Sequence, residues 1–254
     1  MPRVVALALG MLVMLGMATG CADPARTPPV VPAGAIPAGT VLGTAAITGK
    51  ALFAGTPKAP ESINMSSDAT CHGRAESAPV REDLVVGQGG GLKSVFVHVA
   101  GGLPATPFAP PAQAVTLDQR GCIYRPHVVG LQVGQQLLLV NSDPTLHNVH
   151  TVSTANKPFN FGMSIEGQKA PRYFHALEVM VKAKCDVHPW MVSYIGVVGH
   201  PFFAVTGDDG SFAIRGLPAG EYAIEAWHET AGVLKQSVTL SDGETKDISF
   251  TFGR

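Results

Sequence analysis

Glycine and proline are spread along the whole chain, and this distribution most constrains its fold. The 254 residues include 29 Gly and 20 Pro. Both residue types destabilise helix interiors, so the sequence disfavours a helical bundle and favours short strands joined by turns. Charged residues make up only 15% of the chain, with a formal net charge of -1. This balance leaves no basic face for nucleic acid, and we expect no nucleic-acid partner.

Hydrophobic periodicity supports strands. Apolar and polar residues alternate in 247–252, which is typical of a half-buried strand, whereas 94–99 and 136–140 are more continuously apolar. Turn sequences rich in Gly, Pro and Asp separate such segments, at 208–210, 218–220 and 241–243. Short strands at this spacing predict an all-β protein with β-sandwich architecture.

The N-terminus predicts export. A positive start, Met-Pro-Arg, precedes an apolar stretch at 4–17 and small residues at 18–20, so residues 1–20 are interpreted as a signal peptide, with a transmembrane anchor as the alternative. The sequence Ala-Thr-Gly-Cys ending at Cys21 resembles a bacterial lipobox, which implies lipidation of Cys21 and membrane contact only through that anchor. Residues 21–39 contain five prolines and are predicted to be an extended linker.

The C-terminal part contains the run Val-Thr-Gly-Asp-Asp-Gly-Ser-Phe-Ala-Ile-Arg-Gly-Leu-Pro-Ala-Gly-Glu-Tyr at 205–222. It resembles the carboxypeptidase regulatory-like family, which implies a small prealbumin-like β-sandwich with a binding or structural role. The family's first strand is similar to residues 47–53, far upstream. We therefore expect 40–110 and 200–254 to form one sandwich, with 111–199 inserted as a second domain. Two sequential domains are the alternative.

Metal-binding side chains concentrate in two segments. The loop Cys-Asp-Val-His-Pro-Trp-Met, from Cys185 to Met191, follows a predicted strand and contains a thiol, an imidazole and a thioether. Upstream, Asn-Ser-Asp-Pro-Thr-Leu-His-Asn-Val-His follows another predicted strand at 141–150 and offers a second imidazole. Two His, one Cys and a weak Met are the ligands of a blue-copper site.

These residues resemble the cupredoxins, the amicyanin- and plastocyanin-like blue copper proteins, over about residues 111–199. The resemblance rests on the loop from Cys185 to Met191, on the His-Asn-Val-His sequence starting at His147, and on Asn141 six residues earlier. It implies a Greek-key β-sandwich that binds one type 1 copper ion. By this match the copper ligands are His147, Cys185, His188 and Met191.

The same resemblance implies roles for neighbouring residues. Asn148 would form a hydrogen bond near the thiolate and join the two ligand loops. His188 would be a partly exposed ligand through which electrons pass. Pro189 and Trp190 would form an apolar rim on which a partner docks. Lys184 departs from the family, which often places a larger uncharged residue before the Cys.

Cysteine usage supports this assignment. With Cys21 lipidated and Cys185 on the metal, Cys71 and Cys122 remain, and two such thiols in an exported protein are expected to form a disulfide. The alternative is a second metal site built from these two Cys with neighbouring His72 and His127.

The ligand set and the metal each allow a different assignment. His150 could replace His147 as a ligand, or Cys185 could be a structural Cys among core histidines. Zinc is less favoured than copper because structural zinc sites rarely use Met and usually contain paired Cys-x-x-Cys sequences.

Function follows from the predicted site. No Cys-x-x-Cys-His, Gly-x-Ser-x-Gly or His-Glu-x-x-His sequence occurs, so turnover chemistry is unsupported and we expect no enzyme activity. The sequence instead predicts one-electron transfer between a redox donor and acceptor, such as a cytochrome c or a dehydrogenase, in the periplasm or cell envelope. The alternatives are a copper-delivery module and a metal-free structural or carbohydrate-binding lipoprotein.

Overall fold

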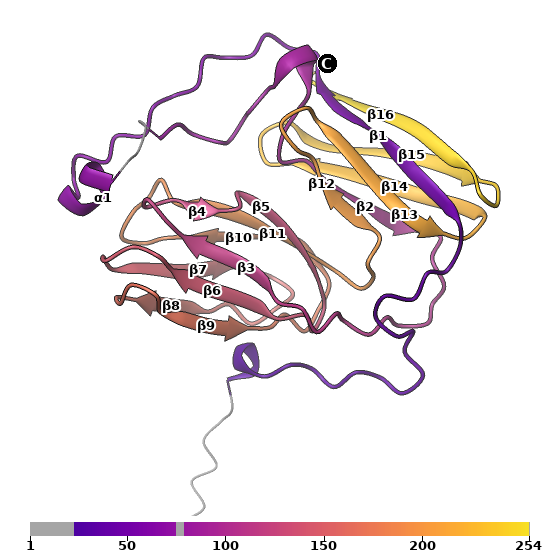
Figure 1. Cartoon of the computed structure of the whole chain (residues 1–254), viewed down its shortest axis with the longest axis horizontal. Helices are drawn as coiled ribbons and strands as arrows, with labels where there is room; N and C mark the ends of the chain where they lie inside the picture. Colours follow the sequence, from indigo (N-terminus) through magenta and orange to yellow (C-terminus); the bar gives the residue numbers. More distant parts are fainter. Residues whose placement is uncertain (1–22, 75–78, 254) are drawn as a thin grey trace, which may run out of the picture.

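The computed structural model describes residues 23–74 and 79–253 and consists almost entirely of strands (Figure 1). The predicted all-β class is confirmed, and the strands form four sheets that pack as two sandwiches. The predicted signal peptide and Cys21 lie outside the described residues. Within the described residues, no helix has the length and apolar character needed to cross a membrane.

The first sandwich contains a five-stranded sheet, in the order β5-β11-β10-β7-β8, and a four-stranded sheet, β4-β3-β6-β9. The pairs β5–β11 and β3–β6 are parallel, so the chain crosses between the sheets instead of running as a simple meander. The strands are β3 (Val115–Gln119), β4 (Tyr124–Arg125), β5 (Val128–Gln132), β6 (Leu137–Asn141), β7 (His147–Val152), β8 (Asn160–Met163), β9 (Lys169–Arg172), β10 (Glu178–Lys184) and β11 (Val192–Val198).

The second sandwich contains the sheets β13-β1-β16 and β12-β2-β14-β15. Its first and last strands, β1 and β16, lie side by side in parallel (Figure 1), so the chain leaves this body, forms the first sandwich and returns. We propose that residues 40–110 and 200–254 form one domain and that residues 111–199 form the other. The strands are β1 (Ala45–Phe53), β2 (Phe96–Gly101), β12 (Phe203–Val205), β13 (Ser211–Leu217), β14 (Gly220–His228), β15 (Gly232–Leu240) and β16 (Thr245–Phe252).

Each sandwich has its own hydrophobic core. In the first, Leu139 from one sheet and Ile195 from the other belong to one buried cluster. In the second, Phe250 from one sheet and Ile224 from the other belong to another buried cluster. Burial of a side chain of this size contributes about 1.5–3 kcal/mol, so each body has its own source of stability.

A small third cluster joins the two bodies. Gly130 of β5 and Gly196 of β11 are register partners in the first sandwich. A Cβ atom on Gly196 would lie 2.5 Å from the Phe96 ring, and one on Gly130 would lie 2.5 Å from the Phe203 ring. Both rings belong to the second sandwich, so the absence of side chains at the two glycines lets the bodies approach closely.

The proline-rich segment corrects one prediction. The linker predicted over 21–39 is described from residue 23, and it is not extended throughout, because it contains the short 3-10 helix η1 (Pro24–Arg26). The Tyr173 N–H donates to the Ala25 carbonyl oxygen at 2.9 Å, and the Ile36 N–H donates to Pro107 at 2.8 Å. Backbone hydrogen bonds therefore fix the segment to the folded body, a role that its composition does not reveal.

A second correction concerns residues 54–74 and 79–83, called the arm below. The arm leaves the second sandwich after β1 and reaches over the end of the first, where it forms helix α1 (Ala69–Arg74) (Figure 1). Its Met65 and Cys71 belong to the core cluster of the first sandwich. Residues of the range 40–110 thus contribute to the hydrophobic cores of both sandwiches. The 3-10 helix η2 (Gln88–Gly90) follows the arm before β2 begins.

Gly196→Ala should weaken the contact between the bodies because the new methyl group would collide with the Phe96 ring. Overpacking of this kind costs about 1–3 kcal/mol. Urea unfolding should show that loss of stability, whereas Gly207→Ala, whose new Cβ would have no neighbour nearer than 4.0 Å, should be close to neutral. Equal stability of the two variants would contradict the role assigned to Gly196.

Candidate metal centre

Two loops meet at one end of the first sandwich. One joins β6 to β7 and ends at His147, and the other joins β10 to β11 and starts at Cys185. Because β7 and β10 are antiparallel neighbours, with Lys184 opposite His150, the start of β7 and the end of β10 lie at the same end of the sheet. Sheet pairing therefore brings together side chains that are far apart in sequence.

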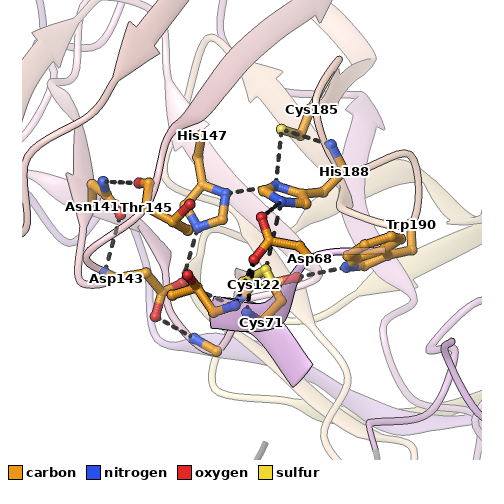
Figure 2. The surroundings of a disulfide bond; sticks show 12 residues. Asp68, Cys71, Cys122, Asn141, Asp143, Thr145, His147, Cys185, His188 and Trp190 are labelled. Atoms are coloured by element: carbon orange, nitrogen blue, oxygen red, sulfur yellow. Dashed lines mark hydrogen bonds and ion pairs between the residues drawn. A yellow bond between two sulfur atoms is a disulfide. The ribbon is translucent and has the colours of Figure 1, made fainter. Parts of the chain in front are cut away.

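The predicted ligands His147, His188 and Cys185 converge in this region (Figure 2). The Nδ1 atoms of the two imidazoles are 2.9 Å apart, and the Cys185 Sγ is 3.8 Å from the His188 Nδ1. Candidate donor atoms from all three lie within 4.8 Å of one another, and all three residues are buried. Two nitrogens and one sulfur thus form a candidate metal-binding group.

A carboxylate holds the far nitrogen of each imidazole. The Asp143 Oδ2 is 3.0 Å from the His147 Nε2, and the Asp68 Oδ2 is 3.1 Å from the His188 Nε2. An ionised carboxylate only accepts, so each Nε2 carries the proton, and in the neutral rings the Nδ1 lone pairs face each other. A proton or a metal ion between them removes that repulsion. Metal-binding histidines commonly have such carboxylate partners, and the residues present therefore fit a metal ion.

The environment of Cys185 favours the thiolate. Burial raises the pKa of this thiol, but hydrogen bonds from His147 and from nearby backbone N–H groups outweigh burial and lower it. One of these N–H groups belongs to His188, whose nitrogen lies 3.4 Å from the sulfur. The thiolate is the form of Cys that binds metals.

The surroundings of His147 make its imidazole more basic. Burial disfavours its charged form, but hydrogen bonds to Asp143 and Cys185 outweigh burial and raise the pKa of His147 to about 9. In the metal-free protein a proton therefore occupies the site near neutral pH. A metal ion at this site would have to displace that proton, so its binding would release protons.

Backbone hydrogen bonds close the ligand loop. The Cys185 N–H donates to the Met191 carbonyl oxygen at 3.1 Å, and the Met191 N–H donates to His188 at 2.9 Å. Met191 is fully buried in the core cluster that also contains Cys185. The loop thus keeps the predicted thioether ligand in the interior of the same end of the sandwich.

Asn148 joins the two ligand segments. Its Oδ1 accepts from the Asp186 N–H at 2.8 Å and lies 3.2 Å from the Cys185 Sγ. Its Nδ2 donates to the Asp186 carboxylate at 3.0 Å. The first residue after Cys185 is therefore tied to β7 through backbone and side chain.

Cys71 and Cys122 form a disulfide beside the site, and the Cys71 Sγ lies 3.5 Å from the His188 Nε2 (Figure 2). The alternative second metal site is wrong because both sulfurs are used in this bond and His127 contacts Glu229 instead. His150 contacts Asp186, 2.9 Å away, and is not part of the donor cluster. The structure therefore does not support the alternative in which His150 replaces His147 as a ligand.

The expected exposure of His188 is wrong. Its side chain is only 2% exposed because Asp68 and the disulfide cover its Nε2 edge. The predicted docking residues are also affected. Pro189 is exposed, but Trp190 is half-buried, and its indole N–H donates to the Cys122 carbonyl oxygen at 2.9 Å. Both line pockets together with arm residues such as Ile63.

Sequence reasoning missed both carboxylates. Asp143 lies within the segment 141–150, and its place four residues before His147 is the signal that could have found it. Its oxygens also accept from the Gly121 and Cys122 N–H groups, each at 2.8 Å. Asp68 has a weaker signal: it lies three residues before Cys71, and the expected disulfide would carry it toward Cys122.

This chain is similar to known proteins only over part of its length. No family model and no curated protein match the chain. Among solved structures it is similar to a copper-containing nitrite reductase from Thermus scotoductus (21% identity, TM-score 0.32), covering 39% of this chain and 25% of the reductase. A Cu(I) amicyanin variant matches at 20% identity and TM-score 0.31, over 40% of this chain and 97% of amicyanin.

A purple cupredoxin from Nitrosopumilus maritimus also matches, at 25% identity and TM-score 0.26, over 30% of this chain and 81% of the cupredoxin. The chain spans a quarter of the length of the nitrite reductase. At these TM-scores the matches do not by themselves establish a family or an activity for this chain. The donor geometry carries the functional conclusion.

Asn148→Ala should loosen the ligand loop, because the Asp186 N–H and the Asp186 carboxylate lose their hydrogen bonds to this side chain. The Asp186 N–H is only partly buried, so the loss of its hydrogen bond should cost about 0.5–1.5 kcal/mol. Urea unfolding of the metal-free protein should show this loss, and the exposed change Lys157→Ala should not. An unchanged free energy of unfolding in Asn148→Ala would show that the side chain does not hold the loop.

Proposed function

We propose that this chain binds one copper ion as a type 1 centre and carries single electrons between redox proteins. The observation that carries this proposal is the pair of Nδ1 atoms 2.9 Å apart, each ring backed by a carboxylate, with the Cys185 sulfur beside them. The proposed ligands are His147, Cys185, His188 and Met191.

Ligand chemistry supports copper over zinc. Two imidazoles, one thiolate and a thioether form the donor set of blue-copper electron-transfer sites, whereas structural zinc sites use four Cys or His ligands. When bound, copper supplies a one-electron couple. The chain supplies rigidity: buried hydrogen bonds fix both imidazole rings and the Cys185 loop, so the donors move little when the ion changes oxidation state.

Partners and location follow from the same proposal. A donor and an acceptor protein, such as a cytochrome c or a dehydrogenase, would exchange electrons with the site, and the chain itself would turn over no substrate. The disulfide supports an oxidising compartment such as the periplasm or cell envelope. Lipidation of Cys21 would hold the protein at a membrane surface, and the second sandwich would be a regulatory-like domain that braces the copper domain.

Copper loading tests the proposal directly. Addition of Cu(II) should produce an intense thiolate-to-copper band in the visible spectrum. Cys185→Ser should abolish it because the thiolate is lost, and Met191→Ala should leave a coloured but altered site because the thioether is a weak ligand. The absence of the band in the loaded wild-type protein would reject a type 1 centre.

Electron exchange then separates a carrier from a delivery module. A carrier predicts rapid electron self-exchange and slow release of copper to a chelator. Slow self-exchange with rapid release would instead indicate copper delivery, and a protein that binds no copper would indicate a structural sandwich. Each of these two outcomes would overturn electron transfer as the function.

A further inference from the structure

The arm of the second sandwich contributes a charged group to the metal centre of the first. Asp68 lies just before α1, and its Oδ1 accepts from the Thr70 and Cys71 N–H groups at 2.8 and 3.0 Å. Its other oxygen, Oδ2, is 3.1 Å from the His188 Nε2 (Figure 2). One oxygen thus fixes the carboxylate to the arm while the other contacts the imidazole.

The disulfide fixes this part of the arm to the first sandwich. Cys71 is three residues after Asp68, and Cys122 lies in the turn before β4. That turn is itself held by Asp143, which also contacts His147. The contacts therefore form a closed ring in which each imidazole is backed by a carboxylate and the disulfide joins the two halves.

We propose that Asp68 is a positioning residue of the metal centre, carried by the arm and held in place by the Cys71–Cys122 disulfide. This inference rests on the proposed copper function. Asp68 accepts the Nε2–H of His188 and so keeps the Nδ1 lone pair directed at the other donors. It also takes the position at the imidazole edge that water would otherwise occupy, which leaves His188 buried.

The negative charge of Asp68 affects the reduction potential of the Cu(II)/Cu(I) couple. An imidazole that donates its N–H to a carboxylate is a stronger ligand, and loss of such a partner typically costs 10- to 100-fold in metal affinity. The doubly charged Cu(II) gains more from the extra negative charge than Cu(I) does. Asp68 should therefore lower the reduction potential of the site.

Asp68→Asn isolates this effect. The amide has the same shape, and its oxygen can still accept from the Thr70 and Cys71 N–H groups, so α1 keeps its start. Its NH2 group, however, faces the Nε2–H of His188, and two donors cannot pair. We expect Cu(II) affinity to fall about 10- to 100-fold. A tenfold loss confined to Cu(II) raises a one-electron potential by about 59 mV.

Glu61→Gln is the matched control. It removes one negative charge from the same arm, at an exposed side chain paired with Arg81. The potential should stay close to that of the wild type. A shift in Glu61→Gln as large as that in Asp68→Asn would assign the effect to general charge and overturn the positioning role.

The double change Cys71→Ser with Cys122→Ser tests the attachment. Without the disulfide the arm should spend less time on the site, so the potential should rise toward that of Asp68→Asn. Adding Asp68→Asn to this double variant should then produce a smaller further shift than it does in the wild type. Full additivity of the two shifts would contradict a shared mechanism.

A measurement without metal keeps this inference separate from the copper function. The 15N chemical shifts of the His188 ring in the metal-free protein should report a proton on Nε2 in the wild type and an altered ring state in Asp68→Asn. Identical shifts in both proteins would overturn the inference even if copper binds. Failure of the wild type to form the visible copper band would reject the proposed function whatever the ring shifts show.

Discussion

The contact between two imidazoles determines the character of this site. Their Nδ1 atoms lie 2.9 Å apart because a carboxylate holds the opposite nitrogen of each ring, and the Cys185 sulfur completes the cluster. Buried polar groups in such an arrangement are costly unless each one is paired. A cation between the two Nδ1 atoms would supply that pairing, and the surrounding hydrogen bonds hold the donor side chains in place.

The second sandwich covers the site that the first sandwich forms. One sandwich carries the donor side chains, while the other sends the arm across its end and buries His188. Under the proposed function, a redox partner would meet arm residues and Pro189 at this end of the molecule, not the imidazole edge of His188. The packing of Phe96 and Phe203 against Gly130 and Gly196 fixes the two bodies in the arrangement that the arm requires.

Local sequence predicted the all-β class and the residues that form the donor cluster, since strand alternation and a short ligand loop depend on neighbours in sequence. Local alternation does not fix burial everywhere: along β10, Val181 is buried, but Val179, on the same side by alternation, is 36% exposed because the pairing with β11 shifts register between them. The path of the arm depends on contacts between distant residues. Asp68 and the burial of His188 were therefore not predictable from spacing alone.

A crystal structure of the copper-loaded protein tests the central claim most directly. The account predicts one copper ion bound by the Nδ1 atoms of His147 and His188 and by the Cys185 Sγ, with Asp143 and Asp68 still on the opposite ring nitrogens. Copper bound at another place, or a His188 ring turned away from the ion, would contradict it.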